Sequence, residues 1–387
     1  MTSGILPIQD IQQLIKTEAL RADRPIEPSQ LQPNSVDLRV GTTAYRARYS
    51  FLPVNQPVAA LLSDLTLDTI DLSRDEGAIL ETGKVYVVPL REQLALPAGL
   101  MASANPKSST GRLDVMVRML TDRGSMFDAV PAGYQGPLYL EIVPRSFPIR
   151  LRADDTLAQL RICQGGLGQL SDDELRHEIA EHQLILAEDG HPIPVEELAL
   201  DDGVFLTVYV ASSRYDETIG FSAKKTTPVV DLRRRDHTRR RFWNYIPSPH
   251  RRRDHLILHP NEFYIFSSRE RVVIPPHLCA EMVPYDAKSG ELRTHYAGFF
   301  DSGFGMGTGG ARVVLEVRNL DVPFLLQDGQ RLFRLRYHRN TSIPQTLYGT
   351  DIASNYQGQS LRLSKHFGLD KGEEDPQLNI FRDGAKE

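Results

Sequence analysis

Residues 80–97 read LETGKVYVVPLREQLALP, and residues 258–275 read LHPNEFYIFSSRERVVIP. The two stretches can be laid over each other at a constant offset of 178 positions, which places Glu92 on Glu270. The same offset places Leu80 on Leu258 and Pro97 on Pro275. The match predicts that the chain carries an internal duplication.

The two copies differ in the segment that follows. At the same offset, the first copy reads KSSTGR at residues 107–112, whereas the second reads YDAKSG at residues 285–290. The adjacent hydroxyls and the arginine are therefore kept in the first copy only. We expect the two copies to have different roles.

Short β-branched runs such as KVYVVPL, VFLTVYV and RVVLEV are separated by many of the 28 glycines and 25 prolines. Such runs are typical of an antiparallel sandwich or barrel. Helical patterns are few: apolar positions recur at helical spacing over residues 8–20, and a capping box at Ser171 opens a helix over residues 171–186. We predict a mainly β chain with a first repeat at 1–204, which includes a helical insert near 165–200, and a second repeat at 205–387.

The composition is that of an ordinary globular protein. The 387 residues suffice for two domains, and a formal charge of −5 gives no general reason to expect a nucleic-acid or membrane partner. No apolar run approaches the roughly 20 residues that cross a bilayer, and the amino terminus lacks the pattern of a secretory signal. Two cysteines, Cys163 and Cys279, exclude a disulfide framework. A cytoplasmic location is the expectation.

Nine arginines lie between Arg233 and Arg253, interleaved with Phe242, Trp243 and Tyr245. Arginine mixed with aromatic residues can bind nucleic acid or polyphosphate by ion pairing and stacking. An exposed connecting loop with solvated charges explains the same pattern. Three interpretations stay open: a solvated connecting loop, local binding of an anion or a partner, and nucleic acid. Nucleic acid is the least favoured, because the rest of the chain is acidic.

The segment KSSTGR carries the clearest chemistry. A lysine, adjacent hydroxyls and an arginine in one turn-forming segment suit phosphate oxygens. The string alone is also typical of a polar surface loop. Its interpretation therefore depends on the segments around it.

Those segments resemble the deoxycytidine triphosphate (dCTP) deaminase branch of the trimeric dUTPase superfamily, in an internally duplicated form. The motifs of that family, in order, are a PxSVDLRLG-like strand, an RSSxxR phosphate loop, an AxxIDPG hairpin that leads to an LEL-like strand, and a closing strand. They are matched by QPNSVDLRVG at 32–41, KSSTGR at 107–112, FDAVPAGYQGPLYLEI at 127–142, PIRLRADDTLAQLRI at 148–162, HYAGFFDSGFG at 295–305, VVLEV at 313–317, PFLLQDGQRLFRL at 323–335 and a tail, YGTDIASNYQGQ, at 348–359.

The resemblance implies β-barrel or jelly-roll units grouped around a threefold axis, with each nucleotide bound between neighbouring units. One unit supplies the phosphate loop and another supplies the base-reading hairpin. The first copy keeps the phosphate loop but has an irregular hairpin, whereas the second has lost the loop and keeps the hairpin. We therefore expect one composite site, built from residues 107–112 and residues 297–304, in a chain that forms a homo-oligomer.

Roles for individual residues follow from the same resemblance. A glutamate in the LEL-like strand acts as general acid and base, and Glu316 is favoured over Glu141 because it follows the better-preserved hairpin. Ser108 and Arg112 position water and stabilise developing charge. The residues expected to bind substrate are Lys107, Ser109, Ala297, Asp301, its first-copy counterpart Asp128, Gln159 and Gln330 in the closing strands, and Tyr348, Tyr356 and Gln359 in the tail.

The expected reaction is hydrolytic deamination of dCTP to dUTP and ammonia. The chain lacks the HxE and PCxxC patterns of zinc deaminases, so we expect no catalytic metal, and Mg²⁺ to arrive on the triphosphate. Asn355 replaces a lysine that is usual in the tail. Two alternatives stay open: a dUTP pyrophosphatase, acting alone or after deamination with Asp301 activating water, and a non-catalytic nucleotide-sensing module.

Overall fold

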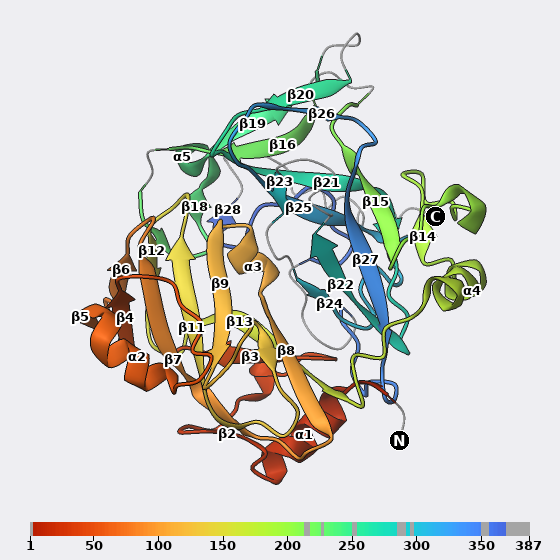
Figure 1. The fold of residues 1–387 in the computed structure, drawn as a ribbon. Helices are drawn as coiled ribbons and strands as arrows, with labels where there is room; N and C mark the ends of the chain where they lie inside the picture. The colour runs from red at the N-terminus through yellow and green to blue at the C-terminus, as the bar shows by residue number, and fades with distance from the viewer. Residues whose placement is uncertain are drawn as a thin grey trace.

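Two β-rich lobes form the protein in this computed structural model (Figure 1). The structure describes residues 3–212, 217–225, 228–249, 254–284, 292–294, 298–349 and 356–368. Its helices are short: α1 (Ile8–Lys16), α2 (Val58–Leu65), α3 (Ser108–Gly111), α4 (Asp172–His182), α5 (Arg239–Phe242) and the 3-10 turns η1 (Pro28–Gln30) and η2 (Val195–Glu197). Across these described ranges, no helix has the length and apolar character that a membrane span requires.

Strands make up most of the regular structure, as predicted. The amino-terminal half contains β1 (Gly4–Ile5), β2 (Leu20–Ala22), β3 (Val36–Arg39), β4 (Thr43–Ala47), β5 (Thr66–Asp71), β6 (Ala78–Leu80), β7 (Val85–Ala95), β8 (Leu100–Pro106), β9 (Val115–Thr121), β10 (Ala129–Val130), β11 (Gln135–Pro144), β12 (Ile149–Leu151) and β13 (Thr156–Gln164). The carboxyl-terminal half contains β14 (Ile185–Leu186), β15 (Val204–Tyr209), β16 (Thr218–Ala223), β17 (Val230–Asp231), β18 (His237–Thr238), β19 (Trp243–Pro247), β20 (His255–Leu258), β21 (Phe263–Val272), β22 (Leu278–Pro284), β23 (Leu292–Thr294), β24 (Phe299–Phe300), β25 (Ala311–Asn319), β26 (Phe324–Gln327), β27 (Arg331–Arg339) and β28 (Phe367–Gly368).

Both lobes use the same antiparallel strand pairing. β7 pairs with β11 in the first lobe, as β21 pairs with β25 in the second. β8 pairs with β13, as β22 pairs with β27. The sequence offset of 178 carries the first residues of β7 and β8 onto those of β21 and β22. Equivalent positions in the two lobes can therefore be read from strand register.

Each lobe has its own apolar core. The inward residues of the first lobe's strands form one cluster, which Trp243 and Phe263 from the second half of the chain also join. The second cluster is built on β15, β21, β22, β25 and β27. Leu175 and Ile179 of the helical insert belong to this second cluster, so the insert packs on the second lobe although the sequence analysis places it in the first repeat.

The two expected helices are both shorter than their patterns. α1 ends at Lys16 rather than at residue 20, because Glu18 has a positive φ of 58° and the chain then enters β2. In α4 the predicted cap is present, since the Ser171 hydroxyl accepts a hydrogen bond from the Glu174 amide. This helix ends where Gln183 adopts a left-handed conformation with φ of 52°.

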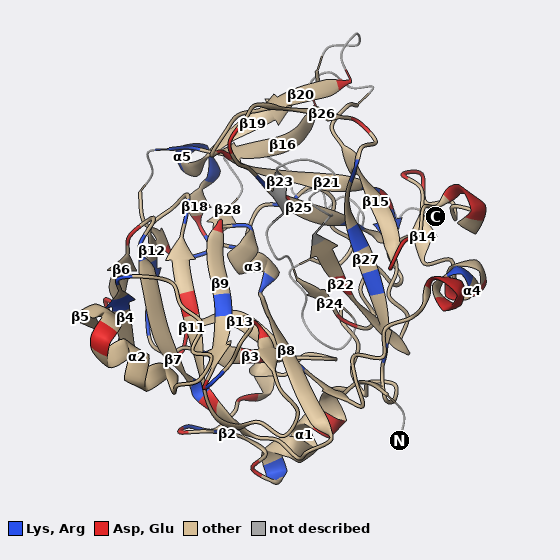
Figure 2. Ribbon diagram, viewed as in Figure 1, with Lys and Arg blue, Asp and Glu red and all other residues tan. Residues whose placement is uncertain are grey.

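The aromatic residues of the arginine-rich segment have a structural role. Phe242 and Trp243 are each 1% exposed, and the Trp243 ring lies 5.1 Å from that of Phe147 in an edge-on contact. Figure 2 colours α5 blue for its arginines, and Arg233 pairs with Asp155. Because the rings of Phe242 and Trp243 are buried, they cannot stack on bases, and the nucleic-acid interpretation is left with the arginines. Residues 250–253 lie outside the described part of the chain.

Candidate active site

A cavity of about 620 Å³ opens between the two lobes. Its volume lies within the roughly 300–1,000 Å³ typical of small-molecule sites. The lining combines residues from both halves of the chain and from its tail: Ile8, Gln12, Pro28, Ser29, Leu31, Gln32, Asp37, Lys107, Ser108, Ser109, Arg112, Gln159, Met282, Phe299, Phe300, Asp301, Phe304, Val314, Glu316, Thr346, Tyr348, Tyr356, Gln359 and Lys365. The loop of the first lobe and the hairpin of the second therefore meet in one cavity, as expected.

The loop at 107–112 leaves the end of β8 and forms the single turn α3. Two hydrogen bonds to the Leu157 carbonyl fix it against β13, one from the Lys107 amide and one from the Thr110 hydroxyl, each 2.9 Å long. The Lys107 ammonium pairs with Asp37 and donates to the Thr156 hydroxyl at 3.1 Å. Ser108, Ser109 and Lys107 all line the cavity. The loop thus presents the donors that suit an anionic group.

The hairpin of the second lobe reaches this loop through Gly298. Its amide donates to the Asn105 side-chain oxygen at 3.1 Å, and its φ of 69° is in the left-handed region that favours glycine. A Cβ at this position would lie only 2.9 Å from the Ser108 hydroxyl. Glycine is therefore required here for both backbone conformation and close approach.

Asp301 ends the hairpin at the cavity wall, where Arg161 of β13 holds it. The Arg161 guanidinium donates to the Asp301 carboxylate at 3.0 Å and to the Ala280 and Phe300 carbonyls at 2.8 and 2.9 Å. It also lies 4.0 Å from the centre of the Phe299 ring. Burial raises the pKa of Asp301, and the charge of Arg161 opposes that rise. The aspartate is therefore fixed in place as an acceptor at the cavity wall.

Glu316 projects from β25 into the same cavity, next to Arg112. Its Oε1 lies 3.8 Å from the Arg112 Nε, and the side chains are 1% and 3% exposed. Burial raises the pKa of Glu316 to about 8, with the charge of Arg112 opposing the rise. Among the described residues, the Oε2 atom of Glu316 has no hydrogen-bond partner. A buried carboxyl group whose pKa is near neutrality can both accept and release a proton.

The tail completes the wall around Arg112. The guanidinium donates to the Gln359 side chain at 2.9 Å and to the Arg362 carbonyl at 3.1 Å, and it lies 4.0 Å from the centre of the Tyr356 ring. The Ser364 hydroxyl donates to the Ser109 carbonyl at 2.7 Å. The tail thus covers the loop of its own chain.

Lys365, which follows the tail motif at 348–359, is a lining residue that the sequence analysis did not predict. Burial, together with the charges of Lys107 and Arg235, lowers its pKa to about 8. The chain lacks the usual tail lysine at Asn355, which lies outside the described residues. Lys365 and Arg235 supply positive charge close to this end of the cavity, although no spacing pattern in the sequence marks either of them.

Glu141 does not reach the cavity. Strand register makes it the first-lobe equivalent of Glu316, because Val87 lies opposite Glu141 and Ile265 lies opposite Glu316. Its carboxylate instead accepts a hydrogen bond from the Arg118 Nε at 3.1 Å. Of the two glutamates, only Glu316 is joined to the phosphate-type loop.

Two further expected residues lie elsewhere. Register aligns Asp128 with Gly298, so it is not the counterpart of Asp301, and its carboxylate accepts from the Met119 amide at 2.7 Å. Gln330 lies in the turn before β27, where its side chain accepts from the Gln327 amide at 3.2 Å. Neither lines the cavity, because each belongs to a local turn. Gln159 does line it, whereas Ala297 lies outside the described residues.

Asp37, Phe299 and Phe300 are among the further lining residues that the sequence analysis did not single out. Asp37 lies within the quoted strand motif QPNSVDLRVG, and Phe299 and Phe300 lie within the quoted hairpin motif. The quoted motifs therefore contain residues that line the cavity. Only the fold shows which side of each segment faces the cavity.

Comparison with known proteins covers almost the whole chain. The family model described as "2'-deoxycytidine 5'-triphosphate deaminase (DCD) N-terminal domain" matches residues 2–166, and the corresponding "C-terminal domain" matches residues 171–367. The crystal structure of 2'-deoxycytidine 5'-triphosphate deaminase from Agrobacterium tumefaciens is similar with a TM-score of 0.84 and 43% identity, over 91% of this chain and 100% of that one.

Shorter relatives match about one lobe's length. A "dCTP deaminase, dUMP-forming" from Persephonella marina is 31% identical over 163 residues, which are 41% of this chain and 81% of that protein. A "dCTP deaminase" from Ignicoccus hospitalis is 27% identical over 131 residues, which are 33% of this chain and 66% of that protein.

Proposed function

The chain belongs to the 2'-deoxycytidine 5'-triphosphate deaminase family, and we propose that the cavity between its lobes is where dCTP and water give dUTP and ammonia. One observation carries the assignment to this cavity: the phosphate-type loop at 107–112, the hairpin ending at Asp301 and the buried Glu316 all line it. Anion binding, sugar recognition and proton transfer are thereby available within one space.

Glu316 is the proposed proton carrier. In its ionised form it takes a proton from water as the water oxygen bonds to C4 of cytosine, and it delivers that proton to the ring nitrogen N3. The second proton of the attacking oxygen passes, again through the carboxylate, to the exocyclic amine as the bond from C4 to that nitrogen breaks. Ammonia leaves, and a carbonyl remains at C4. A pKa of about 8 suits a group that must work in both directions.

Ser108 and Arg112 are proposed to stabilise charge at the reacting carbon. Arg112 lies beside Glu316 and is held by Gln359 and the Arg362 carbonyl, so its direction is fixed before substrate binds. The Ser108 hydroxyl lines the cavity and lies close to Gly298 of the hairpin. Groups fixed in this way need little reorganisation in the transition state, which is the main source of their catalytic effect.

The triphosphate is proposed to bind near Lys107, Ser109 and Lys365. Tyr348, Tyr356 and Gln359 line the same cavity. The sugar is proposed to contact Asp301, where a carboxylate already fixed by Arg161 leaves little space for an extra hydroxyl.

We propose that the deamination step uses no catalytic metal ion. Zinc deaminases hold their metal with His and Cys, and the cavity lining contains neither residue type within the described ranges. Its carboxylates, on Asp37, Asp301 and Glu316, each lie beside a lysine or arginine. Mg²⁺ is therefore expected to arrive as part of the substrate, bound to the phosphates.

Formation of dUTP rather than dUMP is the finer part of the proposal. Pyrophosphate release would need a free base to activate water at the α-phosphate, and the Asp301 carboxylate is already engaged by Arg161. Purified enzyme should be incubated with dCTP and, separately, with dUTP. Ammonia release with accumulation of dUTP supports the proposal, whereas dUMP and pyrophosphate from either nucleotide identify a bifunctional enzyme or a dUTPase.

We further propose that the chain is a tandem duplication of a dUTPase-like unit with one site of this kind per chain. Repeated strand pairing supports the duplication, and Glu141 bound to Arg118 supports a silent second position. Both halves of the cavity come from one chain, so the site needs no second copy. A homo-oligomer stays a proposal from the threefold grouping of the family, and light scattering after size-exclusion chromatography tests it.

A further inference from the structure

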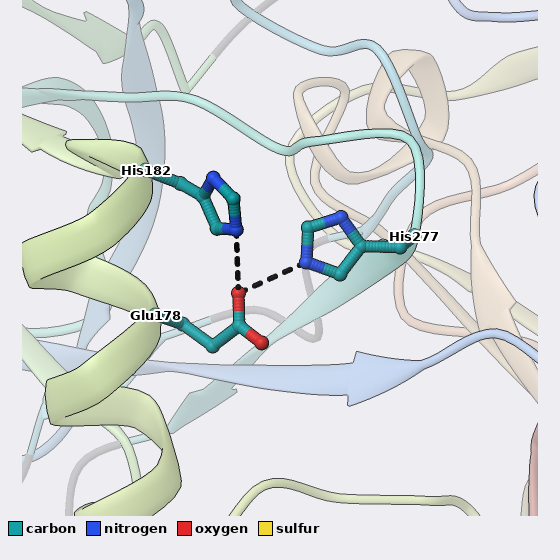
Figure 3. A group of neighbouring side chains, drawn as sticks. All are labelled: Glu178, His182 and His277. Carbon is teal, nitrogen blue, oxygen red and sulfur yellow. Dashed lines mark hydrogen bonds and ion pairs between the residues drawn. The ribbon is translucent and has the colours of Figure 1, made fainter.

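Three potential metal ligands meet where the helical insert contacts the second lobe. Glu178 and His182 are one turn apart on α4, and His277 lies in the segment that leads into β22 (Figure 3). One ligand atom from each residue lies within 4.8 Å of the others. None of the three lines the cavity described above.

The spacing of the donor atoms matches that needed by a small tetrahedral ion. The Glu178 Oε2 lies 2.9 Å from the His277 Nε2 and 3.5 Å from the His182 Nε2. Zinc bonds of about 2.0–2.1 Å in a tetrahedron separate neighbouring donors by roughly 3.3 Å. Figure 3 shows both imidazole rings directed toward the same carboxylate oxygen. Only small side-chain adjustments would bring all three donors onto one ion.

The chemistry of the donors selects a class of metal. Two imidazoles and one carboxylate suit Zn²⁺ and similar transition ions, whereas Mg²⁺ and Ca²⁺ prefer oxygen ligands. His182 and His277 are each 37% exposed and Glu178 is 18% exposed, so the group is reachable from solvent. That exposure leaves room for water as a fourth ligand.

The three residues join two parts of the structure, α4 and the segment that leads into β22. α4 contacts the second core through Leu175 and Ile179. The segment containing His277 continues into β22, whose Ala280 carbonyl accepts a hydrogen bond from Arg161. An ion joining α4 to this segment would stabilise the end of the sheet on which Asp301 and its partner depend.

We propose that Glu178, His182 and His277 bind a zinc-class divalent transition metal ion that fastens α4 to the second lobe. The proposal concerns stability and does not require the ion for deamination. A merely structural arrangement, in which the carboxylate accepts a hydrogen bond from each ring, is the competing explanation.

The test uses full-length protein freed of metal with a chelator. Titration with ZnCl2 followed by calorimetry is expected to show one ion per chain and a higher melting temperature, and MgCl2 is expected to give neither. Co²⁺ in place of zinc should give the visible absorption of a tetrahedral site. His182→Ala, at an exposed position that should not disturb folding, and His277→Ala should each lower zinc affinity about tenfold or more, because one of three ligands is lost.

His177→Ala is the matched control. His177 forms an i, i+4 pair with Glu181 on the same helix, at 3.4 Å, but has no third ligand within the described residues. It should bind zinc as the unmodified protein does. Absence of stoichiometric zinc, or equal binding by the His182 and His177 variants, would overturn the proposal. Ammonia release from dCTP is measured in the same samples. If the metal-free protein binds added zinc but has lost ammonia release, that result contradicts the proposal of metal-independent deamination and leaves the zinc site standing.

Discussion

The Glu316 carboxylate lies 3.8 Å from the Arg112 guanidinium, although Glu316 belongs to β25 of the second lobe and Arg112 follows α3 of the first. The equivalent first-lobe residue, Glu141, is bound to Arg118 and stays outside the cavity. The two glutamates therefore provide a test and its control within one chain. Each occupies the same register position in its own lobe.

Replacing Glu316 by glutamine should lower kcat for dCTP by about 10²–10⁴-fold, the usual contribution of general acid–base catalysis. Glutamine keeps the size of the side chain but cannot carry the proton. Glu141→Gln should leave turnover per folded molecule unchanged. Ammonia release measured with both variants decides, and comparable losses in the two would contradict the assignment of Glu316.

The activity of the unmodified enzyme should depend on the ionisation of Glu316. Because burial raises the pKa of this group to about 8, and the ionised form is needed to accept the water proton, kcat/KM should rise with pH and level off above about 8. A profile measured with dCTP checks this. A rate that falls as pH rises through 8 would instead show that the protonated form reacts.

The same pKa predicts how stability changes with pH. Since the folded-state pKa is about 8 and the ordinary value is 4.5, the folded protein holds the proton over an interval in which the unfolded chain has lost it. The free energy of unfolding should therefore decrease as pH rises from about 4.5 to 8. Glu316→Gln removes this loss.

Urea unfolding at pH 5 and pH 8 provides the measurement. The difference in free energy of unfolding between the Glu316→Gln variant and the unmodified protein should be larger at pH 8 than at pH 5. We expect this difference to grow in favour of the variant by on the order of 1 to 3 kcal/mol. We therefore expect the Glu316→Gln variant to be both inactive and more stable, as is typical when a residue is selected for catalysis and not for stability. An equal difference at both pH values would mean that Glu316 is not buried as a neutral acid.

Gly298→Ala tests the close approach of the hairpin to the loop. Gly298 has a φ of 69°, and an added Cβ would lie 2.9 Å from the Ser108 hydroxyl. Gly307 has the same φ of 69° with no neighbouring atom within 4 Å. Both alanine variants should lose about 1 kcal/mol of stability from the left-handed backbone. Only Gly298→Ala should also reduce kcat, measured as ammonia release.

Sequence reasoning predicted the segments of the site better than the individual side chains. Pairing of the 107–112 loop with the hairpin followed from which copy had kept which motif. Asp128 was assigned by its neighbours in sequence, but a β-hairpin is aligned by strand register, and the register places Asp128 on Gly298. Gln330 was expected in a closing strand, but it lies in the turn that ends just before β27 begins.

Long-range contacts were beyond what a single sequence shows. Nothing in the pattern around Arg161 indicates that it reaches across to Asp301, 140 positions away. The sequence leaves a binding surface open for the two buried aromatic residues near the arginines, because local composition does not reveal that Phe147 lies against them. The helices were overextended because single residues with positive φ ended them.

Lys365 provides the last prediction, because it lines the cavity together with Lys107 of the phosphate-type loop. Lys365→Met should raise KM for dCTP with little change in kcat, because it removes one positive charge near the proposed triphosphate position. We expect a change of about tenfold, which corresponds to about 1.4 kcal/mol of binding free energy. The empty enzyme should become more stable, because Lys107 and Arg235 would no longer face a third positive charge. The unmodified enzyme should show KM rising above pH 8, where the Lys365 ammonium loses its proton, and the variant should lose this rise.

Lys225→Met is the matched control, because that side chain is 75% exposed and pairs only with Glu262 among the described residues. Steady-state kinetics across pH and thermal melting with and without dCTP measure both effects. If Lys365→Met and Lys225→Met gave the same KM, the positive charge in the tail would have no part in binding the triphosphate.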